Sequence, residues 1–445
     1  MGIDICTLGG YSEVGRNCTA VKVDDEVIIL DMGIHLESYI KFTEEREDII
    51  NINPEQLIAN NAVPNVNLIK EWQDKVIAII PSHAHLDHIV AIPFLASRYK
   101  APILCTPFTA AVIKAILKDA KMSLKNPFRT LYAGSRFKIS KNIMVEFINA
   151  THSTPQTVMV ALHTKYGVII YANDFKFDST PVLGAKPDFK RLQELQGKVL
   201  ALISESTYAY EAIKMPSEAV ARELLKEVML GTDHKGKGLV VTTFSSHIAR
   251  LKSIIEFGKR TNRKILFLGR SLAKYTYAAE DVGLVKFSKQ VEIIKYSSKI
   301  SQTLNKVMKQ GKQKYLLVVT GHQGEPTATL SKMIDGKYDF KFGKDDHVIF
   351  SCKVIPTKTN MDNRAFLEKK LGDAGVRIFR DIHVSGHAGR EDLRDLINLV
   401  KPQHLIPSHG EPRMTNSLAE LAMQMGYKSE QLHVSSDGAM ITLLP

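Results

Sequence analysis

A chain of 445 residues is longer than one ordinary domain, so its length predicts two or three domains. It is 44% hydrophobic and 24% charged, as globular proteins are, and 59 Lys and Arg against 47 Asp and Glu give a net charge of +12, which favours an acidic partner such as nucleic acid. No apolar run approaches the roughly 18 residues that span a membrane, and the start MGIDICTLGG lacks a basic segment followed by an apolar one. We therefore expect a protein that is neither secreted nor embedded in a membrane.

The four cysteines point to a reducing compartment. Cys6, Cys18, Cys105 and Cys352 form no CxxC pair, and each lies inside or beside an apolar run. We interpret them as reduced core residues and expect a cytoplasmic protein.

Strand and helix patterns alternate along the chain. Short β-branched runs such as VIILD at 27–31 and KVIAII at 75–80 predict buried strands, and helical patterns lie at 107–121 and 216–230. This alternation predicts an α/β protein. No repeat or Pro/Ser-rich linker appears, so a second domain is expected to be inserted between strands.

The segment SHAHLDH, residues 82–88, follows one of these strands. In an extended stretch alternate residues point the same way, so His83 and His85 can hold one metal ion. Asp87 and His88, after a turn, can hold a second. The HxHxDH spacing thus predicts a metal site at the end of this strand.

Polar side chains follow other predicted strands in the same way. Because ligands bind beyond the carboxyl ends of strands in open α/β sheets, we expect these residues to converge at one edge. They are Asp31, His152, Asp174, Glu205, His387 and His409.

The candidate ligands resemble those of the metallo-β-lactamase superfamily in their residue types and in their order along the chain. That order is HxHxDH, then a lone His, a lone Asp and a distant His. The resemblance implies an αββα sandwich with two zinc ions, or Mn²⁺ or Mg²⁺ in their place. It assigns His83, His85 and His152 to one ion and Asp87, His88 and His409 to the other, with Asp174 bridging both. It further implies that Asp31 orients the first ligands. The loop GGYSEVGRN before Asp31, with Gly9, Gly10 and Gly15, matches the Gly-rich loop of the superfamily's nucleases.

The chain resembles the β-CASP nucleases, and more narrowly the ribonuclease J family, over essentially its whole length. The segments that carry this resemblance are ISEST, TGHQGEP, HVSGHAGREDL and PSHGEP. The resemblance implies an α/β β-CASP domain over 208–360, inserted between metallo-β-lactamase parts at 1–207 and 361–445. The catalytic residues that it implies are Asp31, Asp87, Glu205 and His387.

Two features at the ends of the sequence refine this resemblance. The chain stops at ITLLP soon after the last metal motif, so we expect a compact, archaeal-type member without the extra C-terminal domain of bacterial enzymes. The first predicted strand begins at residue 3, whereas archaeal relatives of the polyadenylation endonuclease add N-terminal KH domains, so we do not expect endonucleolytic 3′-end processing.

Ser245 and Ser246 lie between a predicted strand, GLVVTTF, and a predicted helix, HIARLKSIIEF. Their hydroxyls and the nearby N–H groups can face an anion, although a Ser there is also a common helix N-cap. The resemblance favours a seat for a 5′-phosphate near the metals. The further residues that it brings to this seat are His383, Ser385, Gly386 and Ala388.

These observations predict a zinc-dependent 5′-3′ exoribonuclease that acts on single-stranded RNA with a 5′-monophosphate. The resemblance implies at least a homodimer. Three alternatives stay open: a β-CASP endoribonuclease, a DNA nuclease, and an RNA-binding scaffold without metals. All seven ligand-type residues are present, which argues against the scaffold.

Overall fold

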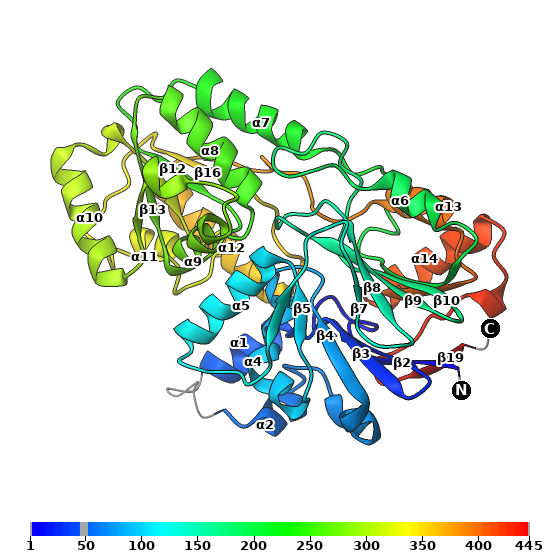
Figure 1. The fold of residues 1–445 in the computed structure, drawn as a ribbon. Coiled ribbons are helices and arrows are strands. Elements are labelled where there is room, and N and C mark those ends of the chain that lie inside the picture. Colours follow the sequence, from blue (N-terminus) through cyan, green and yellow to red (C-terminus); the bar gives the residue numbers. More distant parts are fainter. Residues whose placement is uncertain (1, 45–51, 444–445) are drawn as a thin grey trace. The chain divides into compact units, whose positions relative to one another are not determined.

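A computed structural model describes residues 2–44 and 52–443 (Figure 1). The chain divides into two compact units, and we describe each by itself. Unit 2 comprises Thr180–Leu183 and Pro216–Ser385, and unit 1 contains the rest. The sequence predicts an insertion over 208–360, whereas unit 2 continues to Ser385. It does so because β17 (Arg377–Phe379) pairs in parallel with β16 (His347–Phe350) and so belongs to the sheet of unit 2.

Unit 1 contains two sheets. The first has the strand order β19-β1-β2-β3-β4-β5-β6, and the second has the order β18-β11-β10-β9-β8-β7. The strands of the first are β1 (Ile3–Gly9), β2 (Cys18–Val23), β3 (Glu26–Leu30), β4 (Val76–Ile80), β5 (Ile103–Cys105), β6 (Phe128–Thr130) and β19 (Met440–Leu443). The strands of the second are β7 (Arg136–Lys138), β8 (Met144–Asn149), β9 (Val158–Thr164), β10 (Gly167–Ala172), β11 (Val199–Glu205) and β18 (His404–Ser408).

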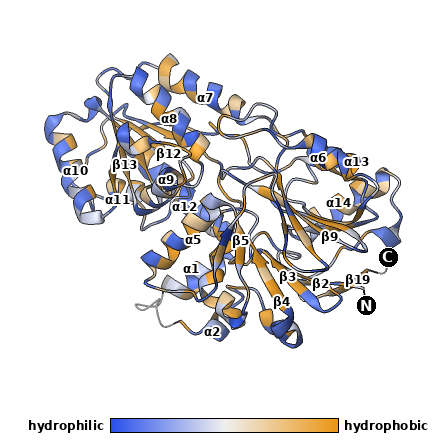
Figure 2. Ribbon diagram, viewed as in Figure 1, coloured by the Kyte–Doolittle hydropathy of each residue, from blue (hydrophilic) through white to orange (hydrophobic). Residues whose placement is uncertain are grey.

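The two sheets of unit 1 share one apolar core. Ile28 and Leu30 of β3 pack there with Phe147 of β8 and Ile169 of β10, while Ile29 is buried on the opposite face of its sheet. This alternation follows from the period of two along a strand. Apolar residues therefore cover both faces, and Figure 2 shows the strands as the most hydrophobic part of the ribbon.

Helices cover the outer faces of both sheets in unit 1. A second core joins the sheet of β8–β11 and β18 to α13 and α14, and α4 and α5 lie beside the first sheet (Figure 1). The predicted αββα arrangement is confirmed. The helices of unit 1 are α1 (Leu36–Glu44), α2 (Pro54–Ala59), α3 (Leu86–Ile89), α4 (Ile92–Leu95), α5 (Pro107–Asp119), α6 (Phe189–Glu194), α13 (Arg390–Val400) and α14 (Pro412–Gln424), with 3-10 turns at Val66–Lys75, Ala96–Arg98 and Ser429–Gln431.

Unit 2 is a doubly wound α/β unit. Its six strands are all parallel, in the order β14-β13-β15-β12-β16-β17. The other strands are β12 (Leu239–Thr242), β13 (Lys264–Leu268), β14 (Glu292–Ile294) and β15 (Tyr315–Val319). Its helices are α7 (Glu218–Gly231), α8 (Ile248–Arg260), α9 (Arg270–Asp281), α10 (Ser297–Gln310), α11 (Thr329–Ile334) and α12 (Lys358–Asp373), with 3-10 turns at Phe287–Lys289 and Lys312–Lys314.

Both faces of the sheet of unit 2 are covered. Leu266 and Leu317 pack with Ile300 and Leu304 of α10 on one face. On the other face α8 approaches so closely that a Cβ on Gly258 would lie 2.5 Å from Leu316 Cδ2. A larger residue at 258 would have to displace the terminal methyl groups of Leu316 and Ile265.

The cysteines and the hydrophobicity of the helices agree with the sequence analysis. The four cysteines are all buried and free, as the sequence predicts. Among the described residues, no helix combines the length and the apolar composition that a bilayer crossing needs.

Candidate metal centre

The predicted ligands lie in unit 1, in the segments that follow its strands. His83 and His85 lie in the loop after β4, and the short helix α3 carries Asp87 and His88. Strand pairing aligns the other segments, because β10, β11 and β18 are parallel neighbours with Glu205 opposite Ser408. Their carboxyl ends therefore meet at one edge. The remaining ligands, His152, Asp174 and His409, follow β8, β10 and β18.

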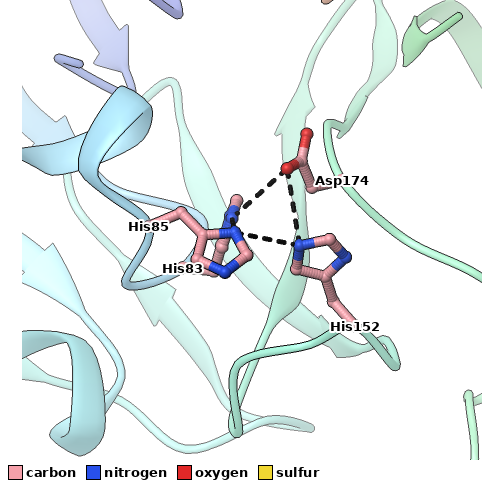
Figure 3. Close-up of side chains that lie close together, drawn as sticks. All are labelled: His83, His85, His152 and Asp174. Atoms are coloured by element: carbon pink, nitrogen blue, oxygen red, sulfur yellow. Dashed lines mark hydrogen bonds and ion pairs between the residues drawn. The ribbon is translucent and has the colours of Figure 1, made fainter. Parts of the chain in front are cut away.

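The first ligand group surrounds one point (Figure 3). His83 Nε2 and His152 Nε2 each lie 3.0 Å from His85 Nδ1. Asp174 Oδ2 lies 3.4 Å from His83 Nε2 and 3.5 Å from His152 Nε2. Tetrahedral ligands about 2.0 to 2.1 Å from a zinc ion are about 3.3 Å apart. The four side chains therefore fit one tetrahedrally coordinated ion.

The second group consists of Asp87, His88 and His409. Asp174 Oδ2 of the first group lies 3.3 Å from His88 Nε2, so the two groups adjoin there. Asp87 Oδ2 lies 3.5 Å from His88 Nε2 and 4.0 Å from His409 Nε2. Asp174 Oδ1, 3.4 Å from His409 Nε2, is buried and accepts no hydrogen bond from the protein. A buried carboxylate oxygen without a donor is costly, and a metal ion would satisfy it.

Hydrogen bonds to Nδ1 fix the orientation of four of the ligand rings. His88 donates from Nδ1 to Asp31 at 2.7 Å, and His152 donates to the Gly386 carbonyl at 2.7 Å. The Nδ1 atoms of His83 and His409 lie 3.0 Å from Ser82 Oγ and 2.9 Å from Asn17 Oδ1. These contacts hold the proton on Nδ1 and leave Nε2 as the metal-binding atom.

Asp31 is fully buried and connects several of these contacts. Besides His88, its carboxylate accepts hydrogen bonds from the Ser82 backbone N–H at 2.6 Å, the Ser82 hydroxyl at 3.0 Å and the Tyr171 hydroxyl at 2.9 Å. Asp31 therefore touches one ligand directly and His83 through Ser82. Its contacts are those of a positioning residue.

Asn17 is a site residue to which sequence reasoning assigned no role. It is buried, its Oδ1 contacts His409, and Asn173 Nδ2 donates to the same oxygen at 3.0 Å. Its place at the end of the loop GGYSEVGRN was the available signal. The sequence also assigned no role to three other residues that contact Asp31 or Asn17, because no local pattern indicates those contacts. They are Ser82, Tyr171 and Asn173.

The backbone of the site is strained at three of its carboxylate and histidine positions. Asp31, Asp174 and His409 have φ angles of 58°, 62° and 50°, in the left-handed region that residues other than glycine seldom adopt. Each follows the end of a strand, where a sharp turn redirects the chain. Such strain persists when many surrounding contacts hold it, and it concentrates at functional sites.

The electrostatics of the site favour a bound cation. Burial lowers the pKa of His83, His85 and His152, so these rings are neutral, the form that binds metal. Burial raises the pKa of Asp174, but the charges of His409, His88 and His387 outweigh it and hold the pKa well below its ordinary value. The carboxylate is therefore ionised within a buried site.

His387 lies beside the metal ligands and is held by Glu205. Its Nδ1 donates to Glu205 Oε2 at 2.8 Å, and its ring stacks on His409 with centroids 5.5 Å apart. Burial lowers the pKa of His387, but the carboxylates of Glu205 and Asp174 raise it to about 9. The side chain is 23% exposed, whereas that of Glu205 is fully buried. His387 can therefore meet a substrate, and Glu205 acts through it.

Two of the residues predicted to bind substrate contact side chains of the site, and their contact with substrate stays a prediction. The Gly386 carbonyl holds His152, and a Cβ on Gly386 would lie 2.2 Å from Ser153 Oγ and 2.9 Å from His152 Nδ1. Ala388 is buried and donates its N–H to Glu205 Oε1 at 3.3 Å. Both contacts position other residues.

The other predicted substrate contacts, Ser245, Ser246, His383 and Ser385, belong to unit 2. Ser245 and Ser246 lie between β12 and α8, and Ser245 Oγ is 3.1 Å from Ser271 Oγ. Neither serine is the N-cap of α8, which is His247. The adjacent ring of Phe244 lies 6.3 Å from that of His383, so these residues share one part of unit 2.

Comparison with known proteins agrees with this fold and site. Family models match residues 52–208 (beta-lactamase superfamily domain), 236–366 (ribonuclease J, beta-CASP domain) and 376–432 (Zn-dependent metallo-hydrolase RNA specificity domain). A crystal structure of a protein of unknown function from Enterococcus faecalis aligns over the whole of both chains, with a TM-score of 0.68 and 18% identity. That likeness concerns the fold alone.

Fold and ligand groups together define a metal-dependent nuclease of the metallo-β-lactamase superfamily with a β-CASP domain. Ribonuclease J of Methanocaldococcus jannaschii is 44% identical to this chain, with 99% of each covered. Ribonuclease J of Pyrococcus abyssi is 42% identical, with 99% of this chain and 97% of the relative covered, and ribonuclease J 1 of Streptococcus pyogenes is 31% identical, with 99% and 74% covered. The chain belongs to the ribonuclease J family.

Proposed function

We propose that this protein is a two-zinc ribonuclease that degrades single-stranded RNA from its 5′ end and prefers a 5′-monophosphate. The observation that carries the proposal is the pair of ligand groups that meet at Asp174, because two adjacent divalent ions suit the hydrolysis of phosphodiesters. The similarity of the chain to ribonuclease J of two archaea supports RNA as the substrate. Manganese is the main alternative to zinc.

The protein residues have separate roles in this proposal. His83, His85 and His152 would hold one ion, Asp87, His88 and His409 the other, with Asp174 shared. When bound, the ions would supply Lewis-acid activation of water and of the phosphate. His387, which Glu205 holds through Nδ1 and which is partly exposed, would donate a proton to the leaving oxygen. Asp31 and Glu205 would position His88 and His387.

Direction and end preference are proposed from unit 2. The segment between β12 and α8 presents Ser245 and Ser246 directly before a helix N-terminus, where hydroxyl and N–H groups can bind a phosphate. The absence of a side-chain cap on α8 supports a role for these serines other than capping. A seat of fixed depth would release one nucleotide at a time and would exclude the bulkier triphosphate.

The test uses one RNA sequence with a 5′-monophosphate or a 5′-triphosphate, labelled at the 3′ end. We expect mononucleotide release and progressive shortening from the 5′ end, slower on the triphosphate and in Ser246→Ala. Ser217→Ala is the matched control, because Ser217 caps α7 through its side chain and lies outside the proposed seat. Products shortened from the 3′ end would overturn the assigned direction.

The same oligonucleotide made as DNA tests the substrate class. We expect slower hydrolysis of DNA than of RNA. The homodimer and the cytoplasmic location, which rest on the family resemblance and on composition, stay predictions.

A further inference from the structure

The positive charge of the chain is concentrated in unit 2. The residues of unit 2 include 31 Lys and Arg against 17 Asp and Glu, whereas unit 1 has 28 against 30. The net charge of +12 therefore arises from unit 2 alone. Its sheet is parallel throughout, so all six strands begin at one edge, which we call the amino edge.

Basic residues gather at the amino edge. The first residue of each strand and the six residues before it contain 14 Lys and Arg and 5 Asp and Glu in all. Three of the five acids are paired within the edge: Glu292 with Lys264 at 2.6 Å, Asp345 with Lys237 at 3.4 Å, and Asp346 with Lys312. The basic residues are Lys235, Lys237, Lys259, Arg260, Arg263, Lys264, Lys286, Lys289, Lys309, Lys312, Lys314, Lys341, Lys344 and Arg377.

The edge is hollowed at the start of β13 and β14. A cavity of about 430 Å³ is lined there by Lys259, Arg263, Lys264 and Lys289. Its one carboxylate is that of Glu292, which Lys264 already neutralises. The cavity therefore offers excess positive charge to an anion.

Hydrogen bonds hold the segments of the edge side by side. The Arg263 guanidinium donates to the carbonyls of His234 at 2.6 Å, Lys237 at 2.9 Å and Tyr315 at 3.2 Å. Lys312 Nζ donates to the Lys341 carbonyl at 3.0 Å. The segments before β12, β13, β15 and β16 thus form one fixed surface, so a ligand would not have to order them.

Helix dipoles offer a simpler reason for basic residues here. The helices between parallel strands run back towards this edge, and cations in their last turns complement the helix dipole. Lys259 and Lys309 fit that reason. Lys235, Lys289 and Lys314 do not, because they lie outside the α-helices; all three are exposed, and within the described chain none of them forms an ion pair.

We propose that the amino edge of unit 2 is a second RNA-binding surface that holds the phosphate backbone of the substrate, separate from the proposed 5′-phosphate seat after the carboxyl end of β12. The repeated negative charge along a nucleic acid is complementary to a surface rich in lysines, and contacts with phosphates are independent of sequence. The identity of the ligand as RNA rests on the proposed function. An acidic protein surface is the alternative ligand.

The test compares Lys235→Ala/Lys289→Ala/Lys314→Ala with a control that loses the same charge from unit 1, Lys141→Ala/Lys186→Ala/Lys190→Ala. The control lysines are also exposed. Affinity for a single-stranded RNA of about 40 nucleotides is measured on chelated protein over a range of salt concentrations, so that hydrolysis plays no part. Each lost phosphate contact lowers the slope of log affinity against log salt by about 0.7.

We expect the amino-edge variant to lose about 2 from the salt slope and about tenfold or more in affinity at low salt. The control variant should match the wild type. Hydrolysis of an RNA of about five nucleotides, which offers few phosphates to a second surface, should proceed at the wild-type rate in both variants. The rate on the short RNA tests the proposed function separately. If the wild-type protein failed to cut it, the nuclease proposal would be overturned, whereas the measured affinity of the amino edge for RNA would still hold.

Unchanged affinity and slope in the amino-edge variant would overturn the second surface. A lower melting temperature of the amino-edge variant with unchanged RNA binding would also overturn the second surface. It would show that these lysines contribute to the stability of the fold. If both variants lost the same affinity for RNA, the loss would follow from the lower net charge of the protein. That result would also exclude a local binding site at the amino edge.

Discussion

Single atoms in the metal centre decide which nitrogen can bind an ion in four of the five ligand rings, those of His83, His88, His152 and His409. The contacts of Nδ1 with Asp31, Ser82, Asn17 and the Gly386 carbonyl leave Nε2 facing the site. Partners of this kind typically change metal affinity by 10- to 100-fold when they are removed. The ligands are therefore only part of what makes the site bind metal.

Gly386→Ala tests this conclusion without changing a ligand. The new Cβ would overlap Ser153 and press on His152, so we expect weaker metal binding by about 10- to 100-fold. The measurement is a titration of metal-free protein in competition with a chromogenic chelator. Gly372→Ala is the control, since a Cβ there meets nothing within 4 Å. Equal metal affinity in both variants would contradict the role of Gly386.

His387→Ala tests the proton donor. Loss of a general acid typically slows a reaction by about 10²- to 10⁴-fold, and the variant should keep its metals and its affinity for RNA. Single-turnover cleavage and metal content are measured on the same preparation, with His433→Ala, which contacts His404 elsewhere in unit 1, as the control. A variant that keeps its metals and cuts at the wild-type rate would reduce His387 to a structural residue.

At the scale of elements, one ion-pair cluster joins the second sheet of unit 1 to a helix. Glu146 on β8 is 2% exposed and accepts hydrogen bonds from His163 on β9 at 2.7 Å and from Arg191 on α6 at 2.8 and 3.0 Å. Arg136 on β7 donates to it at 3.1 Å. Burial raises the pKa of Glu146, but these donors outweigh burial and lower it from 4.5 to about 2.

This shift predicts a pH-dependent effect of Glu146→Gln. A carboxyl whose pKa is lower in the folded state stabilises the fold above its ordinary pKa, and that contribution is lost as the pH falls towards the folded value. We expect the variant to lose at most about 3 kcal/mol of unfolding free energy at neutral pH, a deficit that shrinks between about pH 5 and pH 2. Denaturant unfolding at several pH values measures it. A deficit that stays constant with pH would contradict the assignment.

Some elements could be predicted from the sequence, and others could not. The helical patterns at 107–121 and 216–230 correspond to α5 and α7, because apolar spacing and the Ser217 cap are local signals. The extension of unit 2 to Ser385 was not predicted. The run VRIFRDIHV, which contains β17, indicates a strand, but a local pattern does not tell which sheet the strand joins.

At the scale of the whole molecule, the sequence showed which residue types converge but not how they are held. HxHxDH and the positions after strands predicted which side chains come together, and the resemblance to the metallo-β-lactamase superfamily divided them into two ligand groups. The contact of Asn17 with His409 joins residues 392 positions apart, and the strained φ angles of Asp31 and Asp174 depend on packing around them. Neither leaves a mark on the local sequence. The concentration of positive charge in unit 2 could not be predicted from the sequence either, because the charge of each unit can be counted only when the boundaries of the units are known.

The most direct test of the two-metal account is the metal content of the purified chain, measured by elemental analysis together with the activity on RNA. Two ligand groups that share Asp174 predict two zinc or manganese ions per chain, loss of activity with a chelator, and recovery when the metal is returned. His85→Ala should lose both activity and metal. Trace metal alone, with RNA cleavage unaffected by the chelator, would contradict the account.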